Sequence, residues 1–255
     1  MKILCWNVNG IRAIAKKGFF DWMAKEDADI VCLQETKAHP DQLEALHLTP
    51  PGYDSFWAWA ERPGYSGVAI YTKAACKDCK VGIGIPRFDE QGRTLVLETA
   101  HFTLINGYFP NGGEDNSRVP YKLAYSDAVL EYAKALERQG KSVIICGDLN
   151  TAHAEIDIAR PRENATTTGF LPIERAWMDK LVAAGYVDIF RHLHPGEPNQ
   201  YTWWSYRMRA RERNVGWRID YFFVTPNLVE KVTAASIESQ VTGSDHCPIR
   251  LELDV

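Results

Sequence analysis

Short apolar runs rich in β-branched and aromatic residues recur along the whole chain, and each is bounded by Gly, Pro, Asn or Asp. Runs of this kind are typical of β-strands. They read KILCWNV, DIVCLQ, SFWAWA, GVAIYT, TLVLETA, FTLINGYF, SVIICGD, YTWW, RIDYFFVT, TAASIES and PIRLELD. Their order does not follow a strict alternation of strand and helix. The pattern therefore predicts sheets packed face to face with helices outside.

Helical patterns lie between some of these runs. Apolar residues recur with helical spacing over residues 11–25, 117–138 and 172–185, and Pro172 stands where the third helix is expected to begin. No repeat, low-complexity tract or linker divides the 255 residues. We therefore expect a single catalytic domain over residues 1–255, a length that one sheet-rich domain can reach.

Composition limits the cellular location that is expected but does not decide the function. The net charge of −4 argues neither for nor against a nucleic-acid partner, because positive charge can be concentrated locally. No signal peptide and no apolar run of membrane-spanning length is visible, so we expect a soluble, cytoplasmic protein.

The six cysteines predict a reducing compartment. Cys5, Cys32 and Cys146 lie inside apolar runs and are expected to be buried. Cys76 and Cys79 form an isolated CKDC without the further ligands that a zinc site needs, so we expect surface-loop cysteines.

Polar side chains collect where the predicted strands end. They are Asn7, Asn9, Glu35, Tyr108, Asn111, Asp148, Asn150, Asp220, Asp245 and His246. Taken singly, Asn, Asp and Gly at such places are ordinary turn formers. A turn has no need of Glu35 or His246, however, so the joint pattern favours a functional site built on the rim of a scaffold.

These residue types suit phosphoryl transfer to water. A magnesium ion prefers oxygen ligands, which Asn7, Glu35 and Asp245 would supply, and it would neutralise the phosphate. Asp148 is a candidate general base, and Asn150 would orient the attacking water.

A histidine near the scissile phosphate can donate hydrogen bonds to its non-bridging oxygens. His246 is the candidate, and Asp220 would hold its ring in the correct tautomer.

Several longer motifs carry a resemblance to a known family. They are WNVNGIR, LQETK, GYSGVAIYTK, GYFPNG, GDLNTAH, YTWWSYR, NVGWRIDYFF and GSDHCPI. In this order, and from about residue 3 to the C-terminus, they resemble the exonuclease III family of apurinic/apyrimidinic endonucleases. That family is part of a larger group of metal-dependent phosphodiesterases, which includes deoxyribonuclease I and inositol-polyphosphate phosphatases.

The resemblance implies an α/β fold, a four-layered α/β sandwich with two central mixed β-sheets flanked by helices. It implies Mg²⁺ as the cofactor, with Mn²⁺ as a substitute. The metal-associated residues would be Asn7, Glu35, Asp148, Asn150, Asp245 and His246. The catalytic residues would be Tyr108, Asp148, Asn150, Asp220 and His246, with Tyr108 contacting the phosphate or the leaving group.

A basic, aromatic segment is the candidate DNA-binding face. Residues 207–218 read RMRARERNVGWR, and alternating arginines such as Arg209 and Arg211 beside tryptophans suggest a loop that grips phosphate. The alternative is a solvated charged loop around core aromatic residues.

The resemblance also implies DNA contacts beyond this loop. A small pocket of Trp203, Trp217 and Ile219 would receive a flipped-out abasic sugar, and Gly169 would leave its approach open. Trp217 could equally be a core residue. Further DNA contacts would come from Asn9, Asn111 and Asn164. The family's paired asparagines are matched here only by Asn164, with Arg160 and Arg162 nearby, and an arginine of some relatives is Glu114.

These features together predict a monomeric, magnesium-dependent DNA repair nuclease. It would hydrolyse the phosphodiester bond 5′ to abasic sites in double-stranded DNA, with 3′–5′ exonuclease and 3′-end-cleaning activity. The alternatives are a phosphatase of the same superfamily and a catalytically inactive nucleic-acid-binding regulator. The intact set of catalytic residues argues against the regulator.

Overall fold

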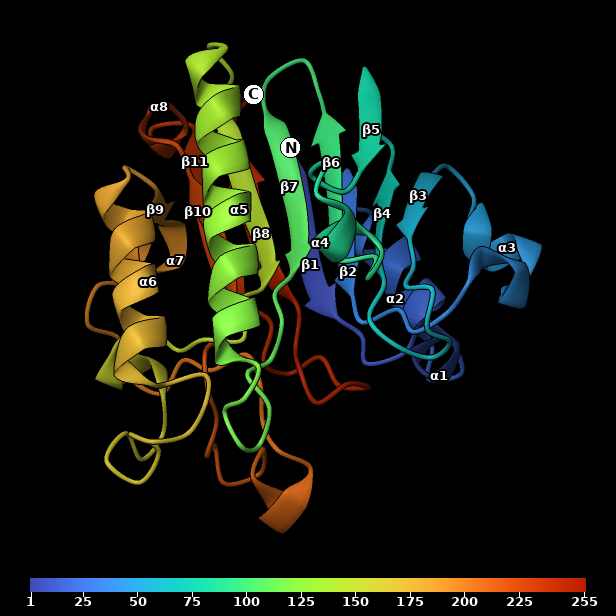
Figure 1. Cartoon of the computed structure of the whole chain (residues 1–255). Helices are drawn as coiled ribbons and strands as arrows, with labels where there is room; N and C mark the ends of the chain where they lie inside the picture. Colours follow the sequence, from blue (N-terminus) through green and yellow to red (C-terminus); the bar gives the residue numbers. More distant parts are fainter.

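Two six-stranded sheets form the centre of the molecule in the computed structural model, which describes residues 1–255 (Figure 1). The first sheet has the order β11 (Val232–Ile237), β12 (Ile249–Leu253), β1 (Lys2–Asn7), β2 (Ile30–Gln34), β4 (Val68–Thr72), β3 (Asp54–Ala58). The second has the order β5 (Asp78–Val81), β6 (Thr94–Glu98), β7 (Thr103–Tyr108), β8 (Val143–Asp148), β10 (Asp220–Val224), β9 (Val187–Asp188). Both sheets are mixed, because β1–β2 and β7–β8 pair in parallel and all other neighbours are antiparallel.

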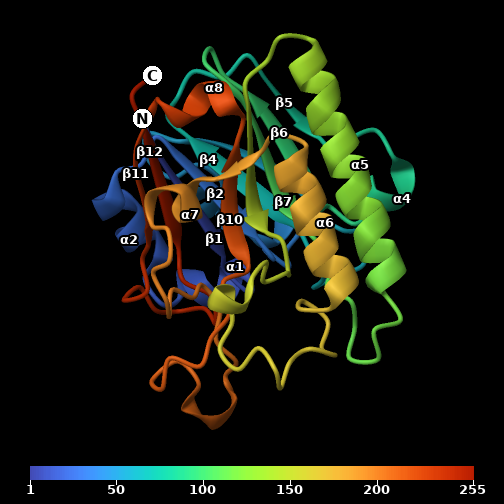
Figure 2. The same ribbon diagram turned by 90° about the vertical axis from the view of Figure 1, so that its left-hand side faces the viewer.

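Helices cover the two outer faces, as Figures 1 and 2 show. The first sheet is covered by α1 (Ile11–Ala15) and α2 (Phe19–Glu26), and the second by α5 (Val119–Arg138) and α6 (Pro172–Ala183). Short segments connect the rest: η1 (Pro40–Gln42), α3 (Ala45–Leu48), α4 (Pro86–Asp89), η2 (Glu155–Asp157), α7 (Ile189–Leu193), η3 (Arg207–Arg209) and α8 (Pro226–Val229). The four-layered α/β sandwich is therefore confirmed.

Strand β8 shows why its sequence is apolar throughout. Ile144 and Cys146 pack in the core between the two sheets, whereas Val143 and Ile145 pack in the core beneath α5. Successive side chains of a strand point to opposite faces, so a strand buried on both faces needs a continuous apolar run. Each large side chain buried in this way contributes about 1.5–3 kcal/mol.

Three local expectations were wrong. The helix expected over residues 11–25 is two helices, because the chain turns at Gly18 with φ 85°, a left-handed conformation that favours glycine. YTWW forms no strand, and Trp203 makes only isolated bridges to Trp217 and His246. Cys79 lies on edge strand β5 and is partly buried rather than in a surface loop.

The topology brings the predicted site residues to one rim. Asn7, Tyr108 and Asp148 end strands β1, β7 and β8. Asp220 was expected at a strand end, yet it begins β10. Since β10 runs antiparallel to β8, with Asp220 opposite Asp148, the start of one strand lies beside the end of the other.

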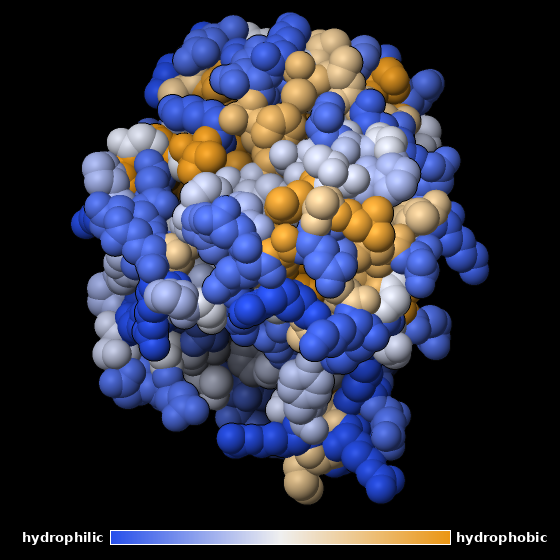
Figure 3. All heavy atoms as spheres, turned by 90° about the vertical axis from the view of Figure 1, so that its right-hand side faces the viewer, coloured by the Kyte–Doolittle hydropathy of each residue, from blue (hydrophilic) through white to orange (hydrophobic).

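This rim faces the lower end of the molecule in Figure 1, opposite both termini, and the 207–209 segment projects beyond it. Figure 3 shows hydrophilic side chains around a hollow at that end, and apolar side chains at mid-height of the same face. None of the helices combines the length and apolar character needed to span a bilayer.

Gly147, the residue before Asp148, provides a test of this architecture. It has φ 138°, and a Cβ there would overlap the carbonyl oxygen of Gly107 on neighbouring strand β7. Gly147→Ala should lower the free energy of unfolding by about 3 kcal/mol or more, from backbone strain plus overpacking. Urea denaturation measures this change.

Gly140→Ala is the matched control. Gly140 also has a positive φ, 79°, but nothing lies within 4 Å of the added Cβ. Its cost should be only about 1 kcal/mol, that of a left-handed alanine. Equal losses at the two positions would contradict the proposed close approach of β7 and β8.

Candidate active site

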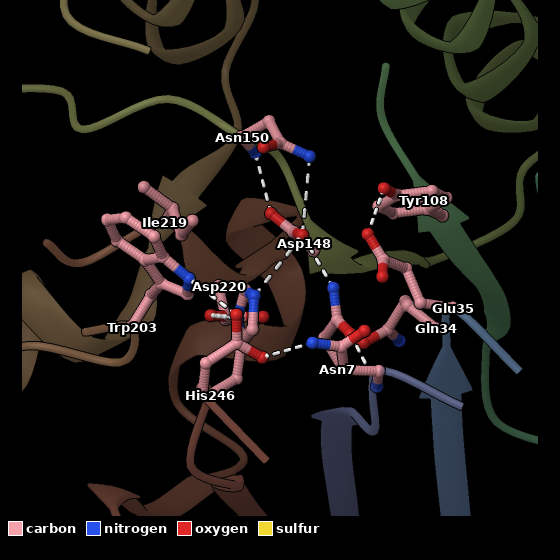
Figure 4. Close-up of polar contacts among 12 residues, drawn as sticks. Asn7, Gln34, Glu35, Tyr108, Asp148, Asn150, Trp203, Ile219, Asp220 and His246 are labelled. Atoms are coloured by element: carbon pink, nitrogen blue, oxygen red, sulfur yellow. Dashed lines mark hydrogen bonds and ion pairs between the residues drawn. The ribbon is translucent and has the colours of Figure 1, made fainter. Parts of the chain in front are cut away.

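Most of the predicted site residues line one cavity of about 510 Å³ at the rim. Its lining residues are Glu35, Tyr108, Asn111, Glu114, Asp148, Asn150, Thr166, Thr167, Thr168, Gly169, Trp203, Trp217, Ile219, Asp245 and His246. Asn7, Asn9 and Asp220 do not line the cavity but contact residues that do. Figure 4 shows the polar side chains of the rim converging from both sheets, among them Asn7, Glu35, Tyr108, Asp148 and His246.

Asp148 is the centre of the hydrogen-bond network in Figure 4. Its Oδ1 accepts from the backbone N–H of Asn150 at 2.8 Å, and its Oδ2 accepts from Asn7 Nδ2 at 2.8 Å and Asn150 Nδ2 at 3.3 Å. The side chain is buried, and this burial raises the pKa of Asp148 above that of an ordinary carboxyl group. A raised pKa suits a group that accepts a proton from water.

His246 is oriented by a buried carboxylate. Its Nδ1 lies 2.8 Å from Asp220 Oδ2, which also accepts from the Thr202 hydroxyl at 2.6 Å. Burial alone would lower the pKa of His246, but the Asp220 carboxylate more than compensates and raises it to about 10. The ring is therefore cationic at neutral pH, and its Nε2 lies 3.8 Å from Asp148 Oδ2.

Glu35 is held by two donors of different kinds. The Tyr108 hydroxyl donates to Glu35 Oε1, and Lys37 Nζ lies 2.8 Å from Oε2. Lys37 also donates to Asn9 Oδ1 at 2.5 Å. Burial and the Glu35 charge keep the pKa of Tyr108 well above its usual value, so the phenol stays protonated.

Asp245 contacts the other end of the Asn9 side-chain amide, whose oxygen accepts from Lys37. Asn9 Nδ2 donates to Asp245 Oδ1 at 2.9 Å, and the indole of Trp203 donates to Oδ2 at 3.1 Å. Burial by itself would raise the pKa of Asp245, but His246 and these hydrogen bonds lower it below its ordinary value. Asp245 is therefore an anion at neutral pH.

Several site residues have a backbone conformation that is uncommon for residues with side chains. Asn9, Glu35 and Asn150 have φ values of 48°, 52° and 51°, in the left-handed region. Each such residue costs about 1 kcal/mol or more, and the surrounding hydrogen bonds must compensate. Of these three residues, Glu35 and Asn150 line the cavity, and Asn9 contacts Asp245, which also lines it.

The charges of the rim fit a divalent cation. The carboxylates of Glu35, Asp148, Asp220 and Asp245 directly face only two cationic groups, Lys37 and His246. The donor set is made of carboxylate and amide oxygens, which Mg²⁺ prefers. The potential ligand atoms of Asp148, Asp220 and His246 lie within 4.8 Å of one another, but the protonated His246 ring would first have to lose a proton. A rim with this excess of negative charge would repel a phosphate unless a cation were bound.

The cavity also has an apolar wall. The rings of Trp203 and Trp217 meet edge to face with centroids 6.0 Å apart, and Ile219 packs beside them. Gly169 lies against this wall, because a Cβ there would be 2.9 Å from the Trp217 ring. The structure therefore places these four residues together, beside the polar rim.

The arginine loop is less uniform than the sequence suggests. Arg209 is 82% exposed, with only a 3.9 Å contact to Glu212. Arg211 instead donates to the backbone carbonyls of Ser239, Val241 and Ser244 and stacks on Trp204.

The prediction that Arg211 grips phosphate stays a prediction, although three of its hydrogen bonds already go to the protein's own backbone. Arg218 is buried and forms ion pairs with Asp157 and Asp188. Both carboxylates are needed because a buried guanidinium without charged partners would be strongly destabilising. Asn164 caps a turn through the carbonyls of Ala159 and Arg160 and does not line the cavity.

Sequence reasoning missed two cations near the rim. Lys37 follows Glu35 by two residues in the motif at the end of the second predicted strand, and this proximity could have indicated that it pairs with Glu35. Arg93 is buried behind Tyr108, donating to its carbonyl at 3.0 Å and to the Tyr65 hydroxyl at 2.6 Å, with no carboxylate partner. A charged residue at the start of the apolar run TLVLE was the only hint.

A family model and two curated relatives match nearly the whole length of the chain. Residues 4–246 match the model of the endonuclease/exonuclease/phosphatase family. The chain is 43% identical to an exodeoxyribonuclease of Bacillus subtilis over 100% of both chains, and 42% identical to the DNA repair nuclease APEX1 of Danio rerio over 100% of this chain and 83% of the relative.

Solved structures agree in fold. AP endonuclease LMAP from Leishmania major superimposes with a TM-score of 0.89 at 31% identity, over 98% of this chain and 86% of that one. A 3′ phosphatase, NExo from Neisseria, solved with a product DNA hairpin, gives a TM-score of 0.89 at 27% identity over 100% of both chains. The rim geometry and these likenesses lead to one conclusion: the chain belongs to the endonuclease/exonuclease/phosphatase family, as a phosphodiesterase nuclease of the exonuclease III type.

Proposed function

We propose that this DNA repair nuclease is magnesium-dependent and hydrolyses the phosphodiester bond 5′ to abasic sites in double-stranded DNA. It would also act as a 3′–5′ exonuclease and clean damaged 3′ ends. One observation carries the proposal: a single cavity joins a carboxylate–histidine rim to an apolar wall of Trp203, Trp217 and Ile219. Chemistry on phosphate and recognition of a sugar without its base would then take place side by side. A monomeric state and a cytoplasmic location stay predictions.

Asp148 would take the proton from the attacking water, which Asn150 would orient. The water oxygen bonds to phosphorus as its proton passes to Asp148, the P–O3′ bond breaks, and the 3′ oxygen leaves as an alkoxide that takes up a proton from solvent. His246, cationic and held by Asp220, would donate to a non-bridging phosphate oxygen. Tyr108 would contact the phosphate beside it.

Glu35, Asn7 and Asp245 would hold Mg²⁺, with Mn²⁺ as a substitute. When bound, the ion neutralises the phosphate and stabilises the leaving oxygen. Asp148, Asn150 and His246 were predicted as ligands as well. An ion there would have to displace the proton of His246, whose other nitrogen is already paired with Asp220.

A 3′-phosphatase activity is a second candidate, because the likeness to NExo extends over both whole chains. It uses the same rim and breaks the same P–O3′ bond, but the phosphorus carries no downstream nucleotide, so the product is inorganic phosphate. An inactive regulator is disfavoured by the complete rim.

Metal dependence is the first test. With magnesium, the protein should cleave a labelled duplex that carries one abasic site, and EDTA should abolish the cleavage, because the rim repels phosphate without a cation. Glu35→Ala should raise the magnesium concentration needed for half-maximal rate. Full activity in EDTA, or an unchanged titration for Glu35→Ala, would contradict the metal proposal.

The general base is tested by Asp148→Asn. The substitution preserves size but removes the proton acceptor, so the single-turnover rate should fall at least about a hundredfold. Affinity for DNA should hold or rise, since one negative charge is gone. A variant that cleaves at the wild-type rate would remove Asp148 from this role.

Binding measurements should distinguish the contribution of phosphate contacts to DNA affinity from that of the apolar wall. Arg209→Ala should flatten the slope of log affinity against log salt by roughly one unit and weaken damaged and intact duplexes equally. Trp217→Ala should leave the slope unchanged and reduce the preference for the abasic duplex. If Trp217→Ala lowers only the melting temperature, Trp217 is a core residue and the recognition wall lies elsewhere.

A further inference from the structure

A buried ion pair lies directly behind the cavity and takes no part in the chemistry described so far. Lys122 is in the first turn of α5 and Glu174 in the first turn of α6, and their side chains are 2% and 0% exposed. Lys122 Nζ lies 2.5 Å from Glu174 Oε1. Removing two charges from water is costly, so a pair this deeply buried calls for a reason beyond stability.

Lys122 contacts the candidate catalytic loop. Its Nζ donates to the backbone carbonyl of Asn150 at 2.6 Å. Asn150 has a left-handed φ of 51°, and its own amide and side chain bond to Asp148. The lysine thus fixes from behind the residue that would orient the attacking water.

Glu174 contacts a neighbouring part of the cavity wall. It accepts hydrogen bonds from the Thr168 hydroxyl at 2.9 Å, from the Gly169 amide at 2.6 Å and from the Leu171 amide at 3.1 Å. Thr168 and Gly169 line the cavity, and Gly169 lies against Trp217. One carboxylate therefore anchors residues 168–171 through three hydrogen bonds.

We propose that Lys122 and Glu174 form a positioning pair that couples the catalytic loop to the wall that selects the substrate. Lys122 fixes Asn150 and so supports the rate on every substrate. Glu174 fixes residues 168–171, which include Gly169 against the Trp217 ring of the apolar wall. It thereby keeps the cavity too narrow for a nucleotide that retains its base. The inference rests on the proposed function, since it assigns this wall to abasic-site selection.

Two charge-neutral double variants separate these roles without leaving a buried charge. Lys122→Met/Glu174→Gln retains an oxygen that can accept from the Gly169 and Leu171 amides. Lys122→Met/Glu174→Met removes that acceptor as well. Lys180→Met is the matched control, because it breaks an exposed α5–α6 ion pair with Asp127, 2.8 Å long, away from the cavity.

The measurements are kcat and KM on an abasic duplex and on an intact duplex with a recessed 3′ end. Both double variants should lose about ten- to a hundredfold in kcat on both substrates, with KM within about twofold, because Asn150 is less well placed. Only Lys122→Met/Glu174→Met should also lose about tenfold in the ratio of abasic to intact cleavage. Lys180→Met should match the wild type in all four parameters.

Each half of the proposal can fail alone. Folded double variants with wild-type kcat would overturn the role of Lys122. An equal substrate ratio in the two double variants would overturn that of Glu174. If the variants do not fold, amide hydrogen exchange of the wild type decides: the Gly169 and Leu171 amides should exchange as slowly as those of β8, and rapid exchange would overturn the anchoring of the wall.

The wild type run beside them tests the proposed function separately. If it cleaves recessed 3′ ends but not abasic duplex, the proposed function fails. The kcat comparison on 3′ ends still tests Lys122 in that case, and hydrogen exchange still tests Glu174.

Discussion

Face-to-face packing of the two sheets is the constraint on which the active site depends. Asn7 and Glu35 come from the first sheet, and Tyr108 and Asp148 from the second. The bonds Asn7–Asp148 and Tyr108–Glu35 cross the space between the sheets. Neither sheet holds a complete site, so any shift of one sheet against the other would separate the carboxylates from their donors.

The strands meet at this rim because of how they pair. Two parallel pairs, β1–β2 and β7–β8, end there, and the antiparallel strands β10 and β12 begin there. Loops that enter strands can therefore supply residues as readily as loops that leave them. Asp220 and His246 are delivered in this way, and the carboxylate can reach the imidazole although the two residues are 26 positions apart.

The carboxylates of the site depend on the hydrogen-bond donors and cations around them. Buried carboxylates are stable only when donors and cations face them. Tyr108 and Lys37 perform this task for Glu35, Asn7 and Asn150 for Asp148, and His246 for Asp220. Further back, the ion pairs around Lys122 and Arg218 hold the loops that carry the cavity walls. Two clusters of paired charges thus lie behind the polar centre, and the Lys122–Glu174 cluster hydrogen-bonds to the backbone of Asn150 and Gly169.

The sequence by itself determined most of the strands, the outer helices except for the break at Gly18, and the motifs that carry the chemistry, because each depends on local periodicity or on residues a few positions apart. It missed the short edge strands β5 and β9. It could not determine which arginines are free, since the partners of Arg211 and Arg218 are up to 61 residues away. It could not place Asp220 at the start of a strand or reveal the pairing of Lys122 with Glu174, which are 52 positions apart. Such contacts exist only after the sheets and helices have packed, so only the tertiary structure decided which charges are buried, which are paired and which remain free to meet DNA.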